Sequence, residues 1–130
     1  MLSSPPLISI ITVVYNGERF LETTILSIIQ QEYKNIEYII IDGGSKDKTL
    51  DIIKKYESKI SKWISEPDKG IYDAMNKGLW VAKGDYVWFI NAGDEIYSTN
   101  TLNKIFDAST VFADVYYGET EEIEENGKKI

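Results

Sequence analysis

The sequence contains no cysteine and no histidine among its 130 residues. Without cysteine the chain can form no disulfide, thiolate nucleophile or Cys-ligated zinc site. Without histidine it lacks the most common general base and the most common ligand of transition metals. Any bound metal must therefore be a hard cation held by oxygen atoms, such as Mg²⁺, Mn²⁺ or Ca²⁺. A general base would have to be a carboxylate or, less commonly, a tyrosine or lysine.

An excess of positive charge is also missing. The formal net charge is −7, so nucleic acids and anionic membrane surfaces are poor partners. Five glutamates crowd the C-terminal end, and residues 119–130 are expected to be a solvated acidic tail or the end of a truncated piece: Glu119, Glu121, Glu122, Glu124 and Glu125.

No signal peptide is evident, because the first six residues carry no basic side chain. The apolar run from Leu7 to Tyr15 is too short to span a bilayer. These features predict a cytoplasmic protein, although a longer parent protein could lie peripherally at the inner membrane face.

Hydrophobic patterning predicts a single α/β domain with a mainly parallel sheet and helices on both faces, because strands and helices alternate along the chain. The apolar fraction of 43% is typical of a globular protein. The first helix should bury Phe20, Leu21, Ile25, Ile28 and Ile29, and the third Ile71, Met75, Leu79 and Ala82. Strands are predicted at 7–14, 35–41, 60–64, 86–90 and 111–117, and helices at 18–31, 48–56, 71–82 and 101–107.

The stretch from Gly84 to Asp94 stands out. It opens with a turn pair, continues with five apolar residues at 86–90, and ends in Asn91-Ala92-Gly93-Asp94. A strand apolar on both alternations is typical of a strand buried on both faces. Parallel sheets bind ligands beyond the carboxyl ends of their strands, so the Asp94 carboxylate could meet a ligand or metal. The alternative is an ordinary turn at Gly93-Asp94.

Three other predicted strands end in similar chemistry, and we expect all four ends at one rim of the sheet. An aromatic ring could stack on a nucleobase there, and carboxylates could accept hydrogen bonds from the base or the ribose. The four ends are Tyr15-Asn16, Asp42 with Gly43-Gly44-Ser45, Glu66-Pro67-Asp68-Lys69, and Asn91 to Asp94.

No phosphate-binding loop of the Walker or Gly-x-Gly-x-x-Gly type follows the first strand. Two unit charges 4 Å apart near a protein surface interact by about 4 kcal/mol, so Asp94 alone would repel a diphosphate. A divalent cation between them would reverse the sign. Asp94 is therefore a candidate metal ligand.

Five segments together resemble the nucleotide-sugar half of family 2 glycosyltransferases, in the right order and over roughly residues 7–118. They are Ser9 to Asn16, Ile41 to Ser45, Asp47 to Thr49, Asp68 to Gly78, and Gly84 to Asp94. The resemblance implies a Rossmann-like GT-A fold, with residues 1–118 as the nucleotide-sugar-binding domain. It also implies transfer of a sugar from a nucleotide-diphosphate donor, a UDP-sugar being favoured, with Mg²⁺ or Mn²⁺ and usually with inversion. The acceptor would be a glycan or a lipid-linked molecule in polysaccharide biosynthesis.

The resemblance also implies roles for particular residues. Tyr15 and Asp42 would contact the nucleoside, Asp94 would bind the metal, and Asp73 and Asn76 would face the donor. Asp73 could equally form an ordinary ion pair with Lys77, and Lys69 is more simply a loop lysine than a phosphate ligand. The remaining candidates around the donor are Asn16, Gly43, Ser45, Lys69, Asn91, Ala92 and Gly93.

Three departures from the family stand out. The family commonly has two acids where this chain has Asp42-Gly43, and its metal-binding element is usually richer in acids. Members also continue well past residue 130, and the acceptor site and catalytic base lie in that later half; no residue here is assigned as the base.

Two alternative functions follow. One is a non-catalytic nucleotide-sugar-binding fragment. The other is a sugar nucleotidyltransferase, which would need a glycine-rich basic loop after the first strand.

Overall fold

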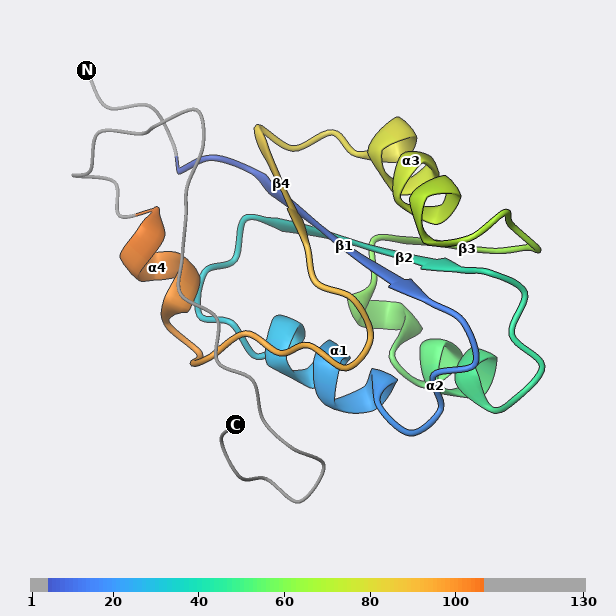
Figure 1. Ribbon diagram of the computed structural model, residues 1–130. Helices are drawn as coiled ribbons and strands as arrows, with labels where there is room; N and C mark the ends of the chain where they lie inside the picture. Colours follow the sequence, from blue (N-terminus) through green and yellow to red (C-terminus); the bar gives the residue numbers. More distant parts are fainter. Residues whose placement is uncertain (1–4, 107–130) are drawn as a thin grey trace, which may run out of the picture.

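The computed structural model describes residues 5–106 as an α/β fold built on a four-stranded sheet (Figure 1). The strands are β1 (Ile8–Val14), β2 (Ile36–Asp42), β3 (Lys62–Ser65) and β4 (Tyr86–Phe89), in the order β3-β2-β1-β4. Every pairing is parallel. The predicted α/β class with a parallel sheet is confirmed. The expected strand at 111–117, the boundary at 118 and the acidic tail lie outside the described residues.

Helices cover both faces of the sheet, as predicted. In Figure 1, α1 (Leu21–Ile29) and α2 (Thr49–Lys55) lie on one face and α3 (Ile71–Val81) lies on the other. A short 3₁₀ turn, η1 (Glu57–Lys59), follows α2, and α4 (Thr101–Ile105) comes after β4. No helix between residues 5 and 106 is both long enough and apolar enough to cross a bilayer.

Strand register brings the carboxyl ends of the strands to one edge. Val14 at the end of β1 lies opposite Asp42, and Asp42 lies opposite Ser65 at the end of β3. On the other side, Ile11 lies opposite Phe89. Every loop that follows a strand therefore leaves the sheet from the same edge, because all four strands run in the same direction.

The core lies on both sides of β1, whose seven residues are all buried. Ile8, Ile10 and Val14 belong to the larger cluster with Leu21, Ile25 and Ile28 of α1. Ile11 and Val13 belong to a smaller cluster with Ala74 of α3. A strand with apolar residues on both alternations buries both faces, as β1 does.

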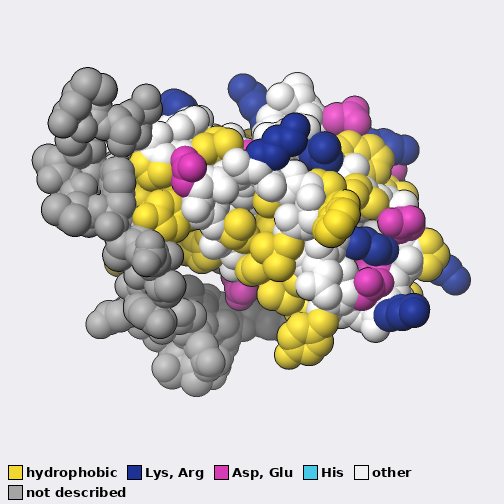
Figure 2. Space-filling view, turned by 90° about the horizontal axis from the view of Figure 1, so that it is seen from above, with side chains coloured by type: hydrophobic (Ala, Val, Ile, Leu, Met, Phe, Trp, Pro, Cys, Tyr) yellow, Lys and Arg dark blue, Asp and Glu magenta, His cyan; other side chains and the backbone are white. Residues whose placement is uncertain are grey.

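The predicted buried face of α3 is only partly right, since Met75 and Ala82 pack against the smaller core cluster but the other two predicted residues do not. Ile71 and Leu79 are 50% and 46% exposed, whereas Ala74 and Gly78 are buried against the sheet. A β-carbon added at Gly78 would lie only 2.6 Å from Cγ2 of Ile11. Small residues therefore let α3 approach the sheet closely, whereas Ile71 and Leu79 remain exposed to solvent. Figure 2 views this side of the molecule, where hydrophobic side chains lie at the surface among charged ones.

Two further expectations about burial are wrong. Phe20 is 42% exposed and precedes α1, so it does not join the buried face. Strand β4 is not buried on both faces, since Val87 is 39% exposed. Within the described residues β4 pairs only with β1 and forms an edge of the sheet. Aromatic and β-branched composition favours a strand, but it does not decide how many faces of that strand are covered.

Candidate functional site

The loops that follow β1 and β2 are hydrogen-bonded side by side. The backbone N–H of Asn16 donates to Oγ of Ser45 at 2.7 Å, and Oδ1 of Asn16 accepts the N–H of Lys46 at 2.9 Å. The N–H of Gly43 donates to the carbonyl of Val14 at 2.9 Å. Asn16 adopts φ of 50°, a left-handed conformation that asparagine tolerates better than most residues. Two of the predicted strand ends therefore form one continuous edge.

The loop after β4 joins the same edge. The N–H of Ala92 donates to the carbonyl of Val13 at 3.2 Å, and a β-carbon at Gly17 would lie 3.5 Å from Cβ of Ala92. We call the three loops 15–17, 42–45 and 91–94 the strand-end rim. The loop after β3 lies against it, because the N–H of Glu66 donates to the carbonyl of Asp42 at 3.1 Å.

Asp42 shapes this rim from inside. Its side chain is fully buried, and Oδ2 accepts hydrogen bonds from the N–H of Gly44 at 3.2 Å and of Ser45 at 3.0 Å. Oδ2 also accepts from Oγ of Ser65 at 2.8 Å, while Oδ1 accepts from Oγ of Ser45. An aspartate that accepts backbone N–H groups two and three residues ahead stabilises the turn. The predicted contact between this carboxylate and a nucleoside stays a prediction.

Tyr15 and Asp94 are the exposed members of the rim. The Tyr15 side chain is 62% exposed, which leaves its ring available for stacking. Asp94 is also exposed, and its carboxylate accepts no hydrogen bond within residues 5–106. The backbone around it does form a turn, with the N–H of Asp94 donating to the carbonyl of Asn91 at 2.9 Å and Gly93 at φ of 103°. The turn is therefore confirmed, and because it leaves the carboxylate exposed, a role of Asp94 toward a ligand or metal stays a prediction.

Thr24 of α1 fixes the backbone of that turn. Its hydroxyl donates to the carbonyl of Asp94 at 2.7 Å and accepts the N–H of Gly93 at 3.0 Å. The side chain is fully buried, so these bonds have no competition from water. Sequence reasoning missed Thr24, because a threonine beside an isoleucine in a helix has no distinctive pattern of its own.

Two more polar side chains, one on α1 and one just after it, hydrogen-bond to the chain that follows the rim. Oγ of Ser27 accepts the N–H of Ile96 at 3.1 Å. The Gln31 amide donates to the carbonyl of Ser98 at 2.6 Å and accepts the N–H of Leu102 at 3.3 Å. Thr24 and Ser27 lie three residues apart on one side of α1, and Gln31 follows just after the C-cap Gln30. Helix α1 and the residue just beyond its end thus hold the segment from the rim to α4.

Asn91, close to Asp94 in the same turn, has a side-chain acceptor that receives no hydrogen bond from the described residues. Its Oδ1 atom is buried and has no partner within the described part of the chain. Buried acceptors are nearly always satisfied, so a bound water or a ligand donor is the expected occupant. This atom is an observation independent of the exposed Asp94 carboxylate.

Asp73 is engaged within its own segment. Its Oδ2 accepts the N–H of Lys69 at 3.0 Å and lies 3.9 Å from Nζ of Lys77. Lys77 also lies 3.4 Å from the Glu66 carboxylate. The ion-pair interpretation of Asp73 therefore has direct support. A role for Asp73, Asn76 or Lys69 toward a donor stays a prediction.

Asp68 lies next to the rim. A β-carbon added at Gly43 would lie 2.8 Å from Oδ2 of Asp68. The other carboxylate oxygen accepts the N–H of Gly70 at 3.0 Å. The sequence placed Asp68 among the strand ends and in a segment of the family resemblance, but it did not assign this aspartate a role of its own.

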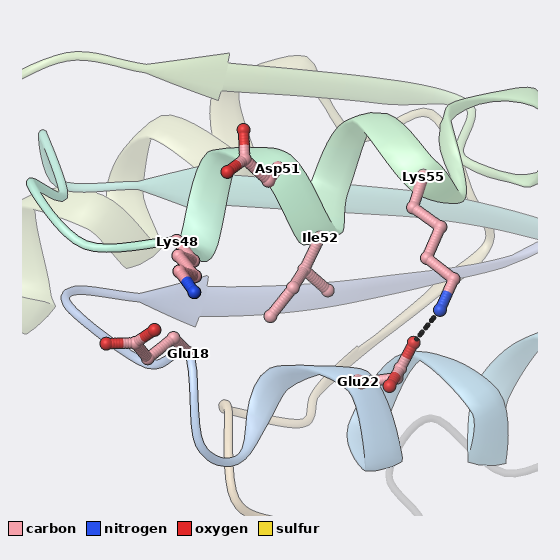
Figure 3. A pocket seen from close by; sticks show the side chains of 6 residues that line it. All are labelled: Glu18, Glu22, Lys48, Asp51, Ile52 and Lys55. Atoms are coloured by element: carbon pink, nitrogen blue, oxygen red, sulfur yellow. Dashed lines mark hydrogen bonds and ion pairs between the residues drawn. The ribbon is translucent and has the colours of Figure 1, made fainter.

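A charged hollow lies between α1 and α2 (Figure 3). An ion pair of 2.7 Å between Lys55 and Glu22 closes one end, and Glu18 and Lys48 lie at the other. The hydrogen bond from Lys55, and then that from Tyr56, lowers the pKa of the Glu22 carboxyl. Because this hollow is lined by side chains of both signs, it offers little net charge to a ligand.

Few side chains in the described part of the chain are arranged to bind a metal ion. Residues 5–106 contain no group of three or more carboxylates arranged to hold a metal ion. Mg²⁺ and Mn²⁺ sites in phosphate-handling proteins often use one or two carboxylates and take their other ligands from substrate phosphates and water. The exposed Asp94 carboxylate and the open acceptor of Asn91 are compatible with such a site, but not with a site made of protein ligands alone.

Comparison with known proteins agrees with this geometry. The family model described as glycosyl transferase family 2 matches residues 9–130. An uncharacterized glycosyltransferase of Mycobacterium tuberculosis strain CDC 1551 is 37% identical over 108 residues, which cover 82% of this chain and 41% of the relative. This chain therefore spans less than half the length of that relative.

Solved structures share the fold. S. aureus TarS 1–349 in complex with UDP-GlcNAc is 27% identical with a TM-score of 0.67, over 75% of this chain and 29% of that one. The mannosyltransferase PcManGT from Pyrobaculum calidifontis, in complex with GDP-Man and Mn²⁺, is 22% identical with a TM-score of 0.70, over 77% and 31%. The sugar nucleotidyltransferase alternative finds no support in these matches.

Proposed function

The chain belongs to glycosyltransferase family 2, and on that premise we propose that it binds the nucleotide-diphosphate part of a sugar donor. The parent protein would transfer the sugar, with inversion, to a glycan or a lipid-linked acceptor. One observation carries the proposal: the loops after β1, β2 and β4 are joined at one rim, where Tyr15 and Asp94 are exposed. An open parallel sheet binds its ligands at this edge.

Within the rim the roles divide by chemistry. The Tyr15 ring would stack on the base, and the loop from Gly43 to Ser45, held by the buried Asp42, would line the nucleoside. Stacking on an exposed aromatic ring and close approach of a glycine backbone both suit a flat heterocycle. The binding of UDP-GlcNAc by the similar TarS fold supports a UDP-sugar as donor.

Asp94 would hold Mg²⁺ or Mn²⁺ together with the phosphates of the donor. When bound, such an ion neutralises the diphosphate and stabilises its departure. The chain contributes an exposed carboxylate whose backbone is fixed by Thr24, and an acceptor on Asn91. The catalytic base that takes the acceptor proton is expected outside the described residues.

Thermal unfolding in the presence of nucleotides tests this proposal. We expect UDP or a UDP-sugar to raise the melting temperature in Mn²⁺ more than in EDTA, with GDP and CMP as comparisons. Asp94→Ala should lose the metal-dependent part of the shift, because it removes the carboxylate offered to the ion. The matched control is Glu95→Ala, which removes an exposed acid one residue away. No stabilisation by any nucleotide would overturn the proposal.

A second candidate is a nucleotide-sugar-binding piece without activity of its own. The observation in its favour is that this chain spans 41% of the mycobacterial relative. Calorimetric binding of a nucleotide sugar, without its hydrolysis or transfer by the isolated chain, would support this candidate. Turnover by the isolated chain would exclude it.

A further inference from the structure

Position 43 is filled by a neighbour's side chain. Gly43 is buried, yet a β-carbon there would meet the carboxyl group of Asp68, with Oδ2 at 2.8 Å and Cγ and Oδ1 at 3.2 Å. These are the three nearest heavy atoms, and all belong to Asp68. The backbone at Gly43 has no left-handed φ that would itself demand glycine. Position 43 is therefore restricted to glycine by steric contact with the Asp68 carboxylate, and not by its backbone conformation.

Only one of the two oxygens of the Asp68 carboxylate accepts a hydrogen bond within the described residues. Oδ1 accepts the N–H of Gly70 at 3.0 Å, which fixes the side chain, whereas Oδ2 accepts no hydrogen bond within residues 5–106. The side chain is half-buried. The loop that carries it is held to the rim, since Gly44 lies tightly against Pro67 and Glu66 bonds the carbonyl of Asp42. Asp68 thus offers a fixed acceptor at the strand-end rim.

We propose that Asp68 reads the nucleobase of the donor by accepting a hydrogen bond from a ring N–H. The inference rests on the proposed function and specifies which nucleobases the donor can carry. Tyr15 follows β1 and Asp68 follows β3, the two strands that flank β2. Gly43, at the end of β2, donates its N–H to the carbonyl of Val14 and lies against the Asp68 carboxylate, so a ring for stacking and a carboxylate for the base edge lie on either side of the end of β2. The carboxylate stands in space where a side chain at position 43 would project.

The chemistry of the bases gives this acceptor its selectivity. Uracil carries N3–H and guanine carries N1–H, and each can donate to a carboxylate. Cytosine has an unprotonated N3 at the same position, whose lone pair would face the carboxylate oxygen. An acceptor-only group therefore selects uracil or guanine over cytosine. A carboxylate left without a donor in the complex costs more binding free energy than the hydrogen bond contributes. The preference for uracil or guanine over cytosine should therefore be strong.

Calorimetric titration of the chain with UDP, GDP and CDP in Mg²⁺ measures this selectivity. Wild type should bind UDP or GDP at least about tenfold more tightly than CDP, as a hydrogen bond to a charged group provides. Asp68→Ala should abolish that preference. Asp68→Asn should shift it toward CDP, because an amide can donate to cytosine N3, a result that a merely structural role would not produce.

The steric relation between positions 43 and 68 gives a reciprocal test. Gly43→Asp alone should weaken binding, since its β-carbon meets the Asp68 carboxyl group. The double variant Gly43→Asp with Asp68→Ala should recover most of the affinity and the base preference, because the carboxylate returns from the neighbouring position. Asp51→Ala, which removes an exposed aspartate on α2, is the control for net charge. Circular dichroism establishes that each variant is folded.

A nucleotide analogue separates this inference from the proposed function. 3-Methyl-UDP lacks the N3–H and should bind wild type as weakly as UDP binds Asp68→Ala, with no further loss in the variant. Equal affinity of wild type and Asp68→Ala for UDP and for GDP would overturn the role of Asp68 while leaving donor binding intact. Failure of wild type to bind any of the nucleotides would overturn both.

Discussion

The Thr24 hydroxyl is a single group on which the position of Asp94 depends. It bonds one N–H and one carbonyl of the turn at Gly93-Asp94, and it does so in a fully buried position. Each buried polar group left without a partner costs about 1–3 kcal/mol. The turn therefore has a definite shape only while this hydroxyl is present.

Thr24→Val, which keeps the shape and removes the hydroxyl, should lower the free energy of unfolding by about 1–3 kcal/mol. It should also weaken the Mn²⁺-dependent part of nucleotide binding, because the backbone of Asp94 loses its anchor. Thr24→Ser should retain both properties. Urea unfolding and calorimetry measure the two effects, and a valine variant equal to wild type in both would contradict the anchoring role.

Helix α3 shows how small residues set the spacing between a helix and a sheet. Ala74 and Gly78 are its buried residues, while Trp80 is 90% exposed. In an exposed helix, replacing glycine by alanine stabilises by about 1 kcal/mol. Here the added β-carbon would lie 2.6 Å from Ile11, so steric overlap outweighs the gain in helix propensity.

Gly78→Ala is therefore expected to lower the free energy of unfolding by about 1–3 kcal/mol, the usual cost of overpacking. Trp80→Ala, elsewhere on α3, should change it little, because that side chain is 90% exposed. Chemical denaturation of both variants tests the difference. A stabilised Gly78→Ala variant would mean that α3 can move away from β1 without cost.

At the scale of the whole molecule, Asp47 ties the start of α2 to the loop before α1. Oδ1 accepts the N–H of Thr49 at 2.9 Å, and Oδ2 accepts the N–H of Glu18 at 3.1 Å. Partial burial raises the pKa of Asp47, but the hydrogen bonds from Thr49 and Glu18 outweigh it, and the pKa lies below its ordinary value. A carboxyl with a lowered pKa in the folded state stabilises the protein above its unfolded pKa.

We expect the free energy of unfolding to fall as the pH drops below the ordinary carboxyl value of 3.8 toward the lower folded pKa of Asp47. Asp47→Asn should show a shallower fall over this range, because its amide does not titrate. Urea unfolding from neutral pH down to about pH 3 measures the slopes, with Asp51→Asn on the exposed side of α2 as control. Equal slopes for wild type and Asp47→Asn would contradict the expectation.

Much of the fold could be predicted from the sequence, because β1 and β2 carry apolar residues on both alternations and are flanked by helices. The packing face of α3 could be predicted only in part, since Ala74 and Gly78 pack by being small and hydrophobic patterning gives weight to large residues. For the site, the strand ends that meet at the rim follow from topology alone. The partners of each side chain do not, so Thr24 was missed and the support that the buried Asp42 gives to the turn at 43–45 was not predicted.

The central place of β1 in the sheet has a consequence during synthesis. Ile8–Val14 leaves the ribosome before both of its neighbouring strands, Ile36–Asp42 and Tyr86–Phe89. At typical translation rates the last of these partners emerges on the order of several seconds later. Until then this hydrophobic strand has an unpaired edge that can associate with other nascent chains. Early binding by a chaperone would protect it from aggregation.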